Sequence, residues 1–235
     1  MVFNGSKNFP DVENLLGRMQ RLGIAFGAHA NAYTSFDETV YMLDLPNLKE
    51  DTLELAFDVM RDFGDGALLA AGEIEKERGV ILSEKRSRDS VEMRLMEKQF
   101  NFLLPDSLIT HRFPIGTEEV IKNAKRDRFT AFYSDYYIPR KMTFVVVGDV
   151  DPDEYEDRIV EAFASMKNPP EAGAEPRMGD IPVGFKFQAA VFSDKEVKSD
   201  ELSLGFVQRY ESKPDRTATR IERMPLSVAN SIIGR

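Results

Sequence analysis

Apolar side chains recur at helical spacing in several stretches of the chain. The first such stretch, residues 11–22, places five apolar residues on one stripe: Val12, Leu15, Leu16, Met19 and Leu22. This spacing is typical of an amphipathic helix, and Gly23 is a suitable stop signal. The same reasoning predicts further helices over residues 49–63, 70–88, 91–104, 118–123, 126–137, 152–166 and 217–233. Gly64 is expected to end the helix over 49–63, and Pro225 is expected to kink or interrupt the last one.

Other stretches are richer in β-branched and aromatic residues. Residues 24–34 and 39–45 are predicted to form two strands joined by a turn at 35–38. Residues 142–147 are an unbroken apolar run, which indicates a buried strand. Two later strands are predicted at 185–192 and 202–207. This order of elements predicts an α+β fold with helices packed on one face of a largely antiparallel sheet.

A change in composition divides the chain near its last third. Residues 168–182 contain four prolines and two glycines with little periodicity, which predicts a linker or an extended crossing loop. Residues 1–167 then form the core of a first domain. Residues 183–235 supply the remaining strands and helix of the same domain and stop without an evident finish.

Composition excludes several classes of function. The formal net charge of −9 over 235 residues makes nucleic acid a poor partner. No apolar run approaches the roughly 18 residues of a membrane-spanning helix, and the first residues do not resemble a signal peptide. The absence of cysteine removes thiolate catalysis, disulfides and cysteine zinc sites. The two histidines, His29 and His111, have no metal-ligand spacing, and each is expected to be an ordinary surface or packing residue.

The long charged helix predicted over residues 70–88 contains two carboxylates that could share a function. Glu77 and Glu84 are seven residues apart and therefore lie on one helical face. Such a pair could hold a cation or support a ligand that does. Spacing alone favours the plainer interpretation, a solvated face on which Glu84 pairs with Arg88 four residues later.

Several stretches, in order, resemble the pitrilysin/insulinase family of zinc metallopeptidases, whose main motif is H-x-x-E-H. Residues 77–84 resemble its downstream zinc segment, and residues 27–41 resemble the strand pair beside its active site. Three further matches are the R-x-P-I-G-T loop at 112–117, the segment at 133–149, and residues 1–6, which resemble the stretch directly after H-x-x-E-H.

The resemblance implies roles for named residues in a processing-peptidase-like metallohydrolase domain. Glu84 matches the zinc ligand and Glu77 the residue that supports it. Asn31, Ala32 and Tyr33 match the edge strand that receives an extended peptide substrate by β-augmentation. These three residues are therefore expected on an exposed strand edge. The family also implies a second homologous half or subunit that closes over the substrate.

The chain departs from the family in one decisive respect, because no H-x-x-E-H occurs in it. The two histidine ligands and the general base are expected to precede Met1. The resemblance thus implies a zinc metalloendopeptidase in an intact parent, with no zinc bound by this chain and no activity of its own. The alternative is a non-catalytic scaffold or partner subunit. Self-association is also expected, and the compartment is periplasm or cytoplasm, with periplasm favoured by the resemblance.

Overall fold

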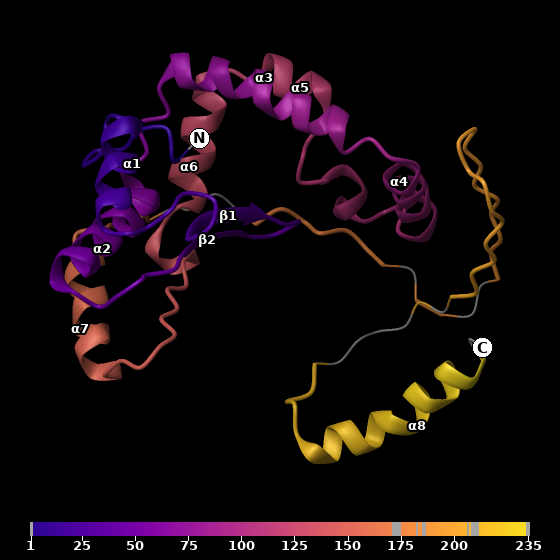
Figure 1. The fold of residues 1–235 in the computed structure, drawn as a ribbon. Coiled ribbons are helices and arrows are strands. Elements are labelled where there is room, and N and C mark those ends of the chain that lie inside the picture. Colours follow the sequence, from indigo (N-terminus) through magenta and orange to yellow (C-terminus); the bar gives the residue numbers. More distant parts are fainter. Residues whose placement is uncertain are drawn as a thin grey trace.

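The computed structural model describes residues 2–170, 175–181, 183–184, 187–205, 207 and 212–233. Helices dominate it, with one short antiparallel sheet (Figure 1). The α+β class predicted from the sequence is confirmed. The elements are α1 Val12–Arg21, β1 Ala30–Thr34, β2 Thr39–Leu43, α2 Glu50–Asp65, α3 Ala71–Ser87, α4 Val91–Leu103, η1 Leu108–His111, α5 Glu118–Asn123, α6 Arg126–Tyr136, η2 Pro139–Lys141, α7 Pro152–Phe163 and α8 Thr217–Ile233.

One apolar core holds the N-terminal part together. Its buried side chains come from the first segment (residues 2–11), from α1 and the turn after it, and from one face of α2: Phe9, Leu15, Met19, Ile24, Leu55, Val59 and Phe63. The α2 members recur every four residues, so they form a single stripe. Each fully buried aliphatic side chain of this kind contributes about 1.5–3 kcal/mol relative to exposure. The core therefore fixes the first segment against α2.

The predicted stop at Gly64 is wrong, because α2 continues to Asp65 and Gly66 forms its C-cap. The Gly66 N–H donates to the Asp62 carbonyl at 2.8 Å. Gly64 stays helical because Met166 packs against it: a Cβ at this position would lie 3.2 Å from the Met166 sulfur. The glycine thus serves close packing inside the helix and does not end it.

The strand pair is shorter than predicted. Residues 24–29 form no regular strand, and β1 begins at Ala30. The turn at 35–38 is confirmed, with the Ser35 N–H donating to the Glu38 carbonyl at 2.9 Å. Pairing runs in register from Ala30 opposite Leu43 to Thr34 opposite Thr39. Within the described residues the sheet contains these two strands only.

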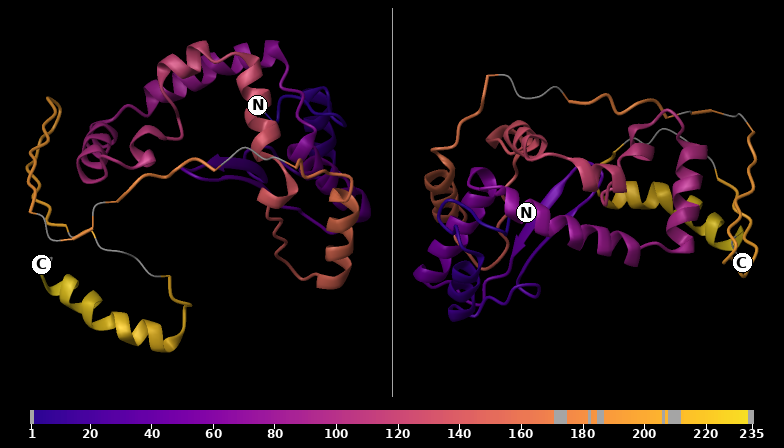
Figure 2. Two further views of the ribbon diagram at one scale, coloured as in Figure 1. Left: turned by 180° about the vertical axis from the view of Figure 1, so that it is seen from behind. Right: turned by 90° about the horizontal axis from the view of Figure 1, so that it is seen from above.

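The long helix α3 lies alongside α5 (Figures 1 and 2). The Arg78 guanidinium donates to the carbonyls of Ile121 and Ala124, which are at and just beyond the end of α5. Further along α3, Lys85 Nζ donates to the Gly116 carbonyl at 2.9 Å. These bonds fix α3 along its length, although its apolar stripe is weak: Ile74 is buried but Val80 is exposed.

The prediction of a buried strand at 142–147 is wrong. These residues carry no strand assignment, and the side chains of Val145 and Val147 are 73% and 91% exposed. Only the first part packs, since Phe144 stacks on Phe57 of α2 with ring centroids 5.8 Å apart. The physical reason is pairing: a buried strand needs neighbours for its backbone groups, and the described residues provide none beside this run.

The C-terminal part departs from the sequence expectation in the same way. The described portions of the predicted strands at 185–192 and 202–207 carry no strand assignment, and residues 185, 186 and 206 lie outside the described residues. The predicted linker at 168–182 is described except for residues 171–174 and 182. Helix α8 is confirmed and runs through Pro225 without an assigned break, with its described apolar side chains exposed.

Candidate functional site

Both sequence-predicted glutamates lie on α3, two turns apart. The Glu77 side chain is half-buried, and its Oε1 accepts a hydrogen bond from Asn4 Nδ2 at 2.7 Å. The Glu84 side chain is 40% exposed and forms an ion pair with Arg88, with 2.5 Å between Oε1 and Nη2. Glu77 is therefore held by a residue distant in the chain, whereas Glu84 has only a local, solvent-facing partner that another cation could replace.

Asn4 belongs to a segment that is firmly attached to the start of α3. Gly5 pairs with the α2–α3 connection, since its carbonyl accepts from the Leu68 N–H at 3.1 Å. Asn8 donates to the buried Asp62 carboxylate from its backbone N–H at 2.7 Å and from Nδ2 at 3.0 Å. Gly5 adopts a φ of 122°, which only glycine accommodates readily. This geometry brings the first residues beside α3.

The connection that leads into α3 is held from α6 as well. The Tyr133 hydroxyl donates to the Phe63 carbonyl at 2.8 Å and accepts from the Ala67 N–H at 3.2 Å. Arg126 Nε donates to the carbonyl of Leu69 at 2.7 Å. Leu69 has a φ of 45°, unusual for a residue with a side chain, and it is buried. These bonds hold the strained turn from which α3 departs.

The other predicted site residues, Asn31, Ala32 and Tyr33, form the middle of β1. Within the described residues β1 pairs with β2 on one side and with no further strand on the other. Its side chains alternate, with Ala30 buried, and Asn31 and Tyr33 exposed. The Tyr33 hydroxyl donates to Glu38 Oε1 at 3.3 Å. Local desolvation and the Glu38 carboxylate raise the pKa of Tyr33, so the phenol stays neutral.

The first segment links the strand pair to α3. The Phe3 ring contacts Tyr41 of β2 in an edge-on arrangement, with centroids 6.1 Å apart, while the next residue, Asn4, bonds to Glu77. No bond joins Glu77 or Glu84 directly to β1 among the described residues. Sequence reasoning missed Asn4, because a hydrogen bond between residues 73 positions apart leaves no periodic signal.

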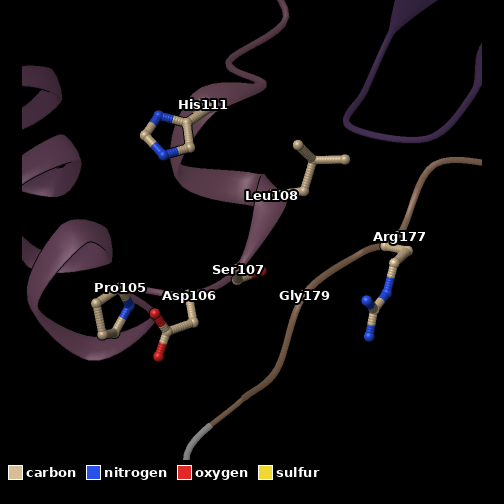
Figure 3. A pocket seen from close by; sticks show the side chains of 7 residues that line it. All are labelled: Pro105, Asp106, Ser107, Leu108, His111, Arg177 and Gly179. Atoms are coloured by element: carbon tan, nitrogen blue, oxygen red, sulfur yellow. The ribbon is translucent and has the colours of Figure 1, made fainter.

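The two histidines do not join this arrangement. His29 Nδ1 accepts the Ala25 backbone N–H at 3.0 Å, which is a structural turn contact. His111 ends η1 and lines a small cavity of about 170 Å³, together with Asp106, Arg177 and Gly179 (Figure 3). This cavity lies between η1 and residues 175–181, called the crossing segment below. Over the described ranges, no group of three or more His, Asp or Glu side chains could hold a metal ion. The described donors therefore do not make up a complete zinc site, which needs three or four ligands.

Family models match nearly the whole chain. Residues 1–109 match the model described as insulinase (peptidase family M16), and residues 123–235 match the model described as the peptidase M16 inactive domain. The fold is that of a zinc metallopeptidase domain. The chain belongs to the pitrilysin/insulinase family, as its sequence motifs indicated.

Individual relatives support the same family assignment. The probable zinc protease PqqL of Escherichia coli is 30% identical over 204 residues, which cover 87% of this chain and 22% of that protein. The chloroplastic stromal processing peptidase of Oryza sativa subsp. japonica is 31% identical over 199 residues, 83% of this chain and 15% of that protein. The chain thus spans 22% and 15% of the length of these two curated relatives.

Solved structures of family members share the fold. The first half of the periplasmic protease PqqL from Escherichia coli has a TM-score of 0.70 at 31% identity and covers 78% of this chain and 38% of that one. The ferredoxin protease FusC, solved in complex with Arabidopsis ferredoxin, has a TM-score of 0.68 at 28% identity, covering 77% and 20%. No helix among the described residues is long and apolar enough to cross a membrane.

Proposed function

We propose that this chain is the part of a zinc-dependent metalloendopeptidase that carries the downstream zinc ligand and the substrate strand. In the intact parent, Glu84 is the ligand, Glu77 supports it, and Asn31, Ala32 and Tyr33 receive the substrate. The observation that supports this proposal most strongly is the hydrogen bond between Asn4 and Glu77. It joins α3 to the segment that resembles the stretch after H-x-x-E-H. The bond supports an expected position of that motif near the Glu77 end of α3.

The substrate is an extended protein segment. An open strand edge binds such a segment through its backbone, so recognition depends weakly on side chains. Among the described residues, β1 pairs with another strand on one side only, and this supports the assignment. FusC, a relative solved with ferredoxin, is named as a protease acting on a protein substrate. The compartment we propose is the periplasm, because the related PqqL is a periplasmic protease.

The 235 residues alone bind no zinc at this position and cleave no peptide. One carboxylate, already paired with Arg88, cannot supply the apparent binding free energy of roughly 10–16 kcal/mol typical of complete structural zinc sites. The general base of the motif is also absent, and its loss alone removes about 10²–10⁴-fold in rate. Among the described residues, Glu84 belongs to no group of three or more His, Asp or Glu side chains that could hold a metal ion.

We propose two kinds of macromolecular partner, one from the family architecture and one from the exposed apolar side chains. A second homologous half or subunit closes over the peptide, as the family architecture implies. Self-association of the chain is also proposed, because large apolar side chains are exposed to solvent: Val145, Val147, Leu202 and Leu204. A clean monomer in light scattering at high protein concentration would contradict self-association.

The second candidate function is a non-catalytic scaffold or partner subunit of the same fold. The ion pair between Glu84 and Arg88 favours it, since a neutralised carboxylate needs no metal. The discriminating experiment extends the chain upstream along its natural reading frame and measures zinc content and peptide cleavage. The enzyme assignment is supported if the upstream frame encodes H-x-x-E-H and the Glu84→Gln variant loses both zinc and peptide cleavage. Glu73→Gln is the matched control, because Glu73 forms a surface pair with Lys76 on the same helix.

If the upstream reading frame encodes no H-x-x-E-H, the scaffold assignment replaces the enzyme. The assignment of Glu84 as the zinc ligand is refuted if the extended protein keeps full zinc and cleavage with Glu84→Gln, because the ligand would then lie elsewhere.

A further inference from the structure

The open edge of β1 presents few free backbone groups. In an antiparallel pair, opposite residues alternate between those that bond to each other and those whose N–H and C=O point outward. The bonds from the Ser35 N–H to Glu38 and from the Asp44 N–H to His29 fix this alternation at both ends of the hairpin. Asn31 and Tyr33 therefore face β2 with their backbone groups, and Ala30, Ala32 and Thr34 face outward.

Part of this outward edge is already occupied by the chain itself. The Ala30 carbonyl accepts the Gly27 N–H at 2.9 Å, which closes the edge at the start of β1. At its centre, the Ala32 N–H donates to Asn31 Oδ1 at 2.8 Å. The preceding side chain thus covers the outward donor in the middle of the strand. Ala30 forms an isolated bridge with Phe26, so the outward groups of β1 that remain are the Ala32 carbonyl and the backbone N–H and C=O of Thr34.

We propose that the Asn31 side chain is a displaceable cap on the substrate edge of β1. When an extended peptide adds to this edge, one of its backbone carbonyls replaces Asn31 Oδ1 as the acceptor for the Ala32 N–H. The released Asn31 amide then turns away from the edge. This inference deepens the proposed function and rests on the assignment of β1 as the peptide-binding strand.

The cap protects the open strand edge from pairing with unrelated strands. An unpaired edge strand pairs with any other strand that reaches it, including one from a second copy. A side-chain bond on an exposed residue satisfies the donor at small cost, because its net strength in water is modest. A peptide that forms several backbone hydrogen bonds at once displaces the Asn31 side chain. A single chance contact gains too little free energy to do so.

Amide exchange of the free chain tests the cap without any ligand. The Ala32 N–H is followed by hydrogen–deuterium exchange in NMR spectra of the wild type, Asn31→Ala and Asn31→Asp. We expect exchange at Ala32 about three- to tenfold faster in Asn31→Ala, the factor that corresponds to one modest hydrogen bond. Asn31→Asp keeps an acceptor oxygen and should exchange as slowly as the wild type. Equal exchange in Asn31→Ala and the wild type overturns the cap.

Peptide binding tests the displacement. The probe is a fluorescently labelled acetyl-Val-Thr-Val-Thr-amide, with an analogue N-methylated at alternate amides as the control for backbone pairing. Asn31→Ala should bind the probe about three- to tenfold more tightly than the wild type, because no cap has to be removed. Equal or weaker binding by Asn31→Ala overturns the proposal, since Asn31 would then be a direct contact or a bystander.

The two measurements separate this proposal from the function it rests on. If the probe binds none of the variants, the assignment of β1 as the peptide strand fails, and the exchange rates at Ala32 still decide whether Asn31 caps the edge.

Discussion

Replacing Tyr133 by phenylalanine removes one hydroxyl that supports the start of α3. This hydroxyl donates to the Phe63 carbonyl at 2.8 Å and accepts the Ala67 N–H at 3.2 Å. Burial raises the pKa of Tyr133, as expected for a phenol packed inside the fold. The phenylalanine ring fills the same space, so the substitution tests these two hydrogen bonds and a longer contact of the same hydroxyl with the Asp62 carbonyl at 3.3 Å.

The magnitude follows from the groups left behind. Each lost bond costs about 0.5–1.5 kcal/mol net, and a part-buried donor left without a partner costs about 1–3 kcal/mol. We therefore expect Tyr133→Phe to lower the free energy of unfolding by about 1–3 kcal/mol. Urea unfolding followed by circular dichroism measures the change, with an unchanged dependence on urea concentration showing that the folded state is otherwise intact.

The matched control is Tyr136→Phe, one helical turn further along α6. The Tyr136 ring stacks on Phe132 and lies under Lys141 Nζ, contacts that phenylalanine largely keeps. No hydrogen bond joins the Tyr136 hydroxyl to the part of the chain that the structure describes. Its substitution should stay within about 0.5 kcal/mol of the wild type. Equal effects of the two substitutions would refute the assigned role of the Tyr133 hydroxyl.

Three further predictions concern contacts that hold other segments in place. Asn4→Leu removes the bond to Glu77 and should cost about 0.5–1.5 kcal/mol in urea unfolding, while Asn4→Asp should cost more, because it sets two carboxylates side by side. The Arg94 guanidinium lowers the pKa of Asp194 to about 2, so this ion pair is complete above pH 3.8 and is lost as the pH falls through about 2. Carbon NMR of the Asp194 carboxyl should show that midpoint, and Arg94→Gln should return it toward 3.8; an unchanged midpoint would exclude the pairing. Gly179→Ala should detach the crossing segment from η1, because its Cβ would clash with the backbone carbonyl of Asp106, and unaltered amide shifts in η1 would contradict this.

Local features of the fold were predictable from the sequence. Helix α5 has the predicted bounds, and α1 and α3 lie within a residue or two of theirs. Their start signals are local, such as the Asp11 carboxylate that caps α1 and the Thr117 hydroxyl that caps α5. The turn at 35–38 was equally local. Such signals act within a few residues, so a pattern along the chain contains them.

Features that depend on distant partners were not predictable in the same way. The run at 142–147 has the composition of a buried strand, but composition does not specify which strands lie beside it. The carbonyl contacts of Arg78 and the bond between Asn4 and Glu77 join segments far apart in sequence. The candidate site residues came from the family resemblance, since spacing alone favoured an ordinary charged face for Glu77 and Glu84.

The measurement that tests the central claim most directly is metal analysis of this chain beside a version extended upstream in its natural reading frame. Both proteins are purified, exposed to zinc and dialysed, and their zinc content per chain is determined. The account predicts stoichiometric zinc in the extended protein, lost in Glu84→Gln, and none retained by the 235 residues alone. Stoichiometric zinc bound by the 235-residue chain and released by Glu84→Gln would contradict it.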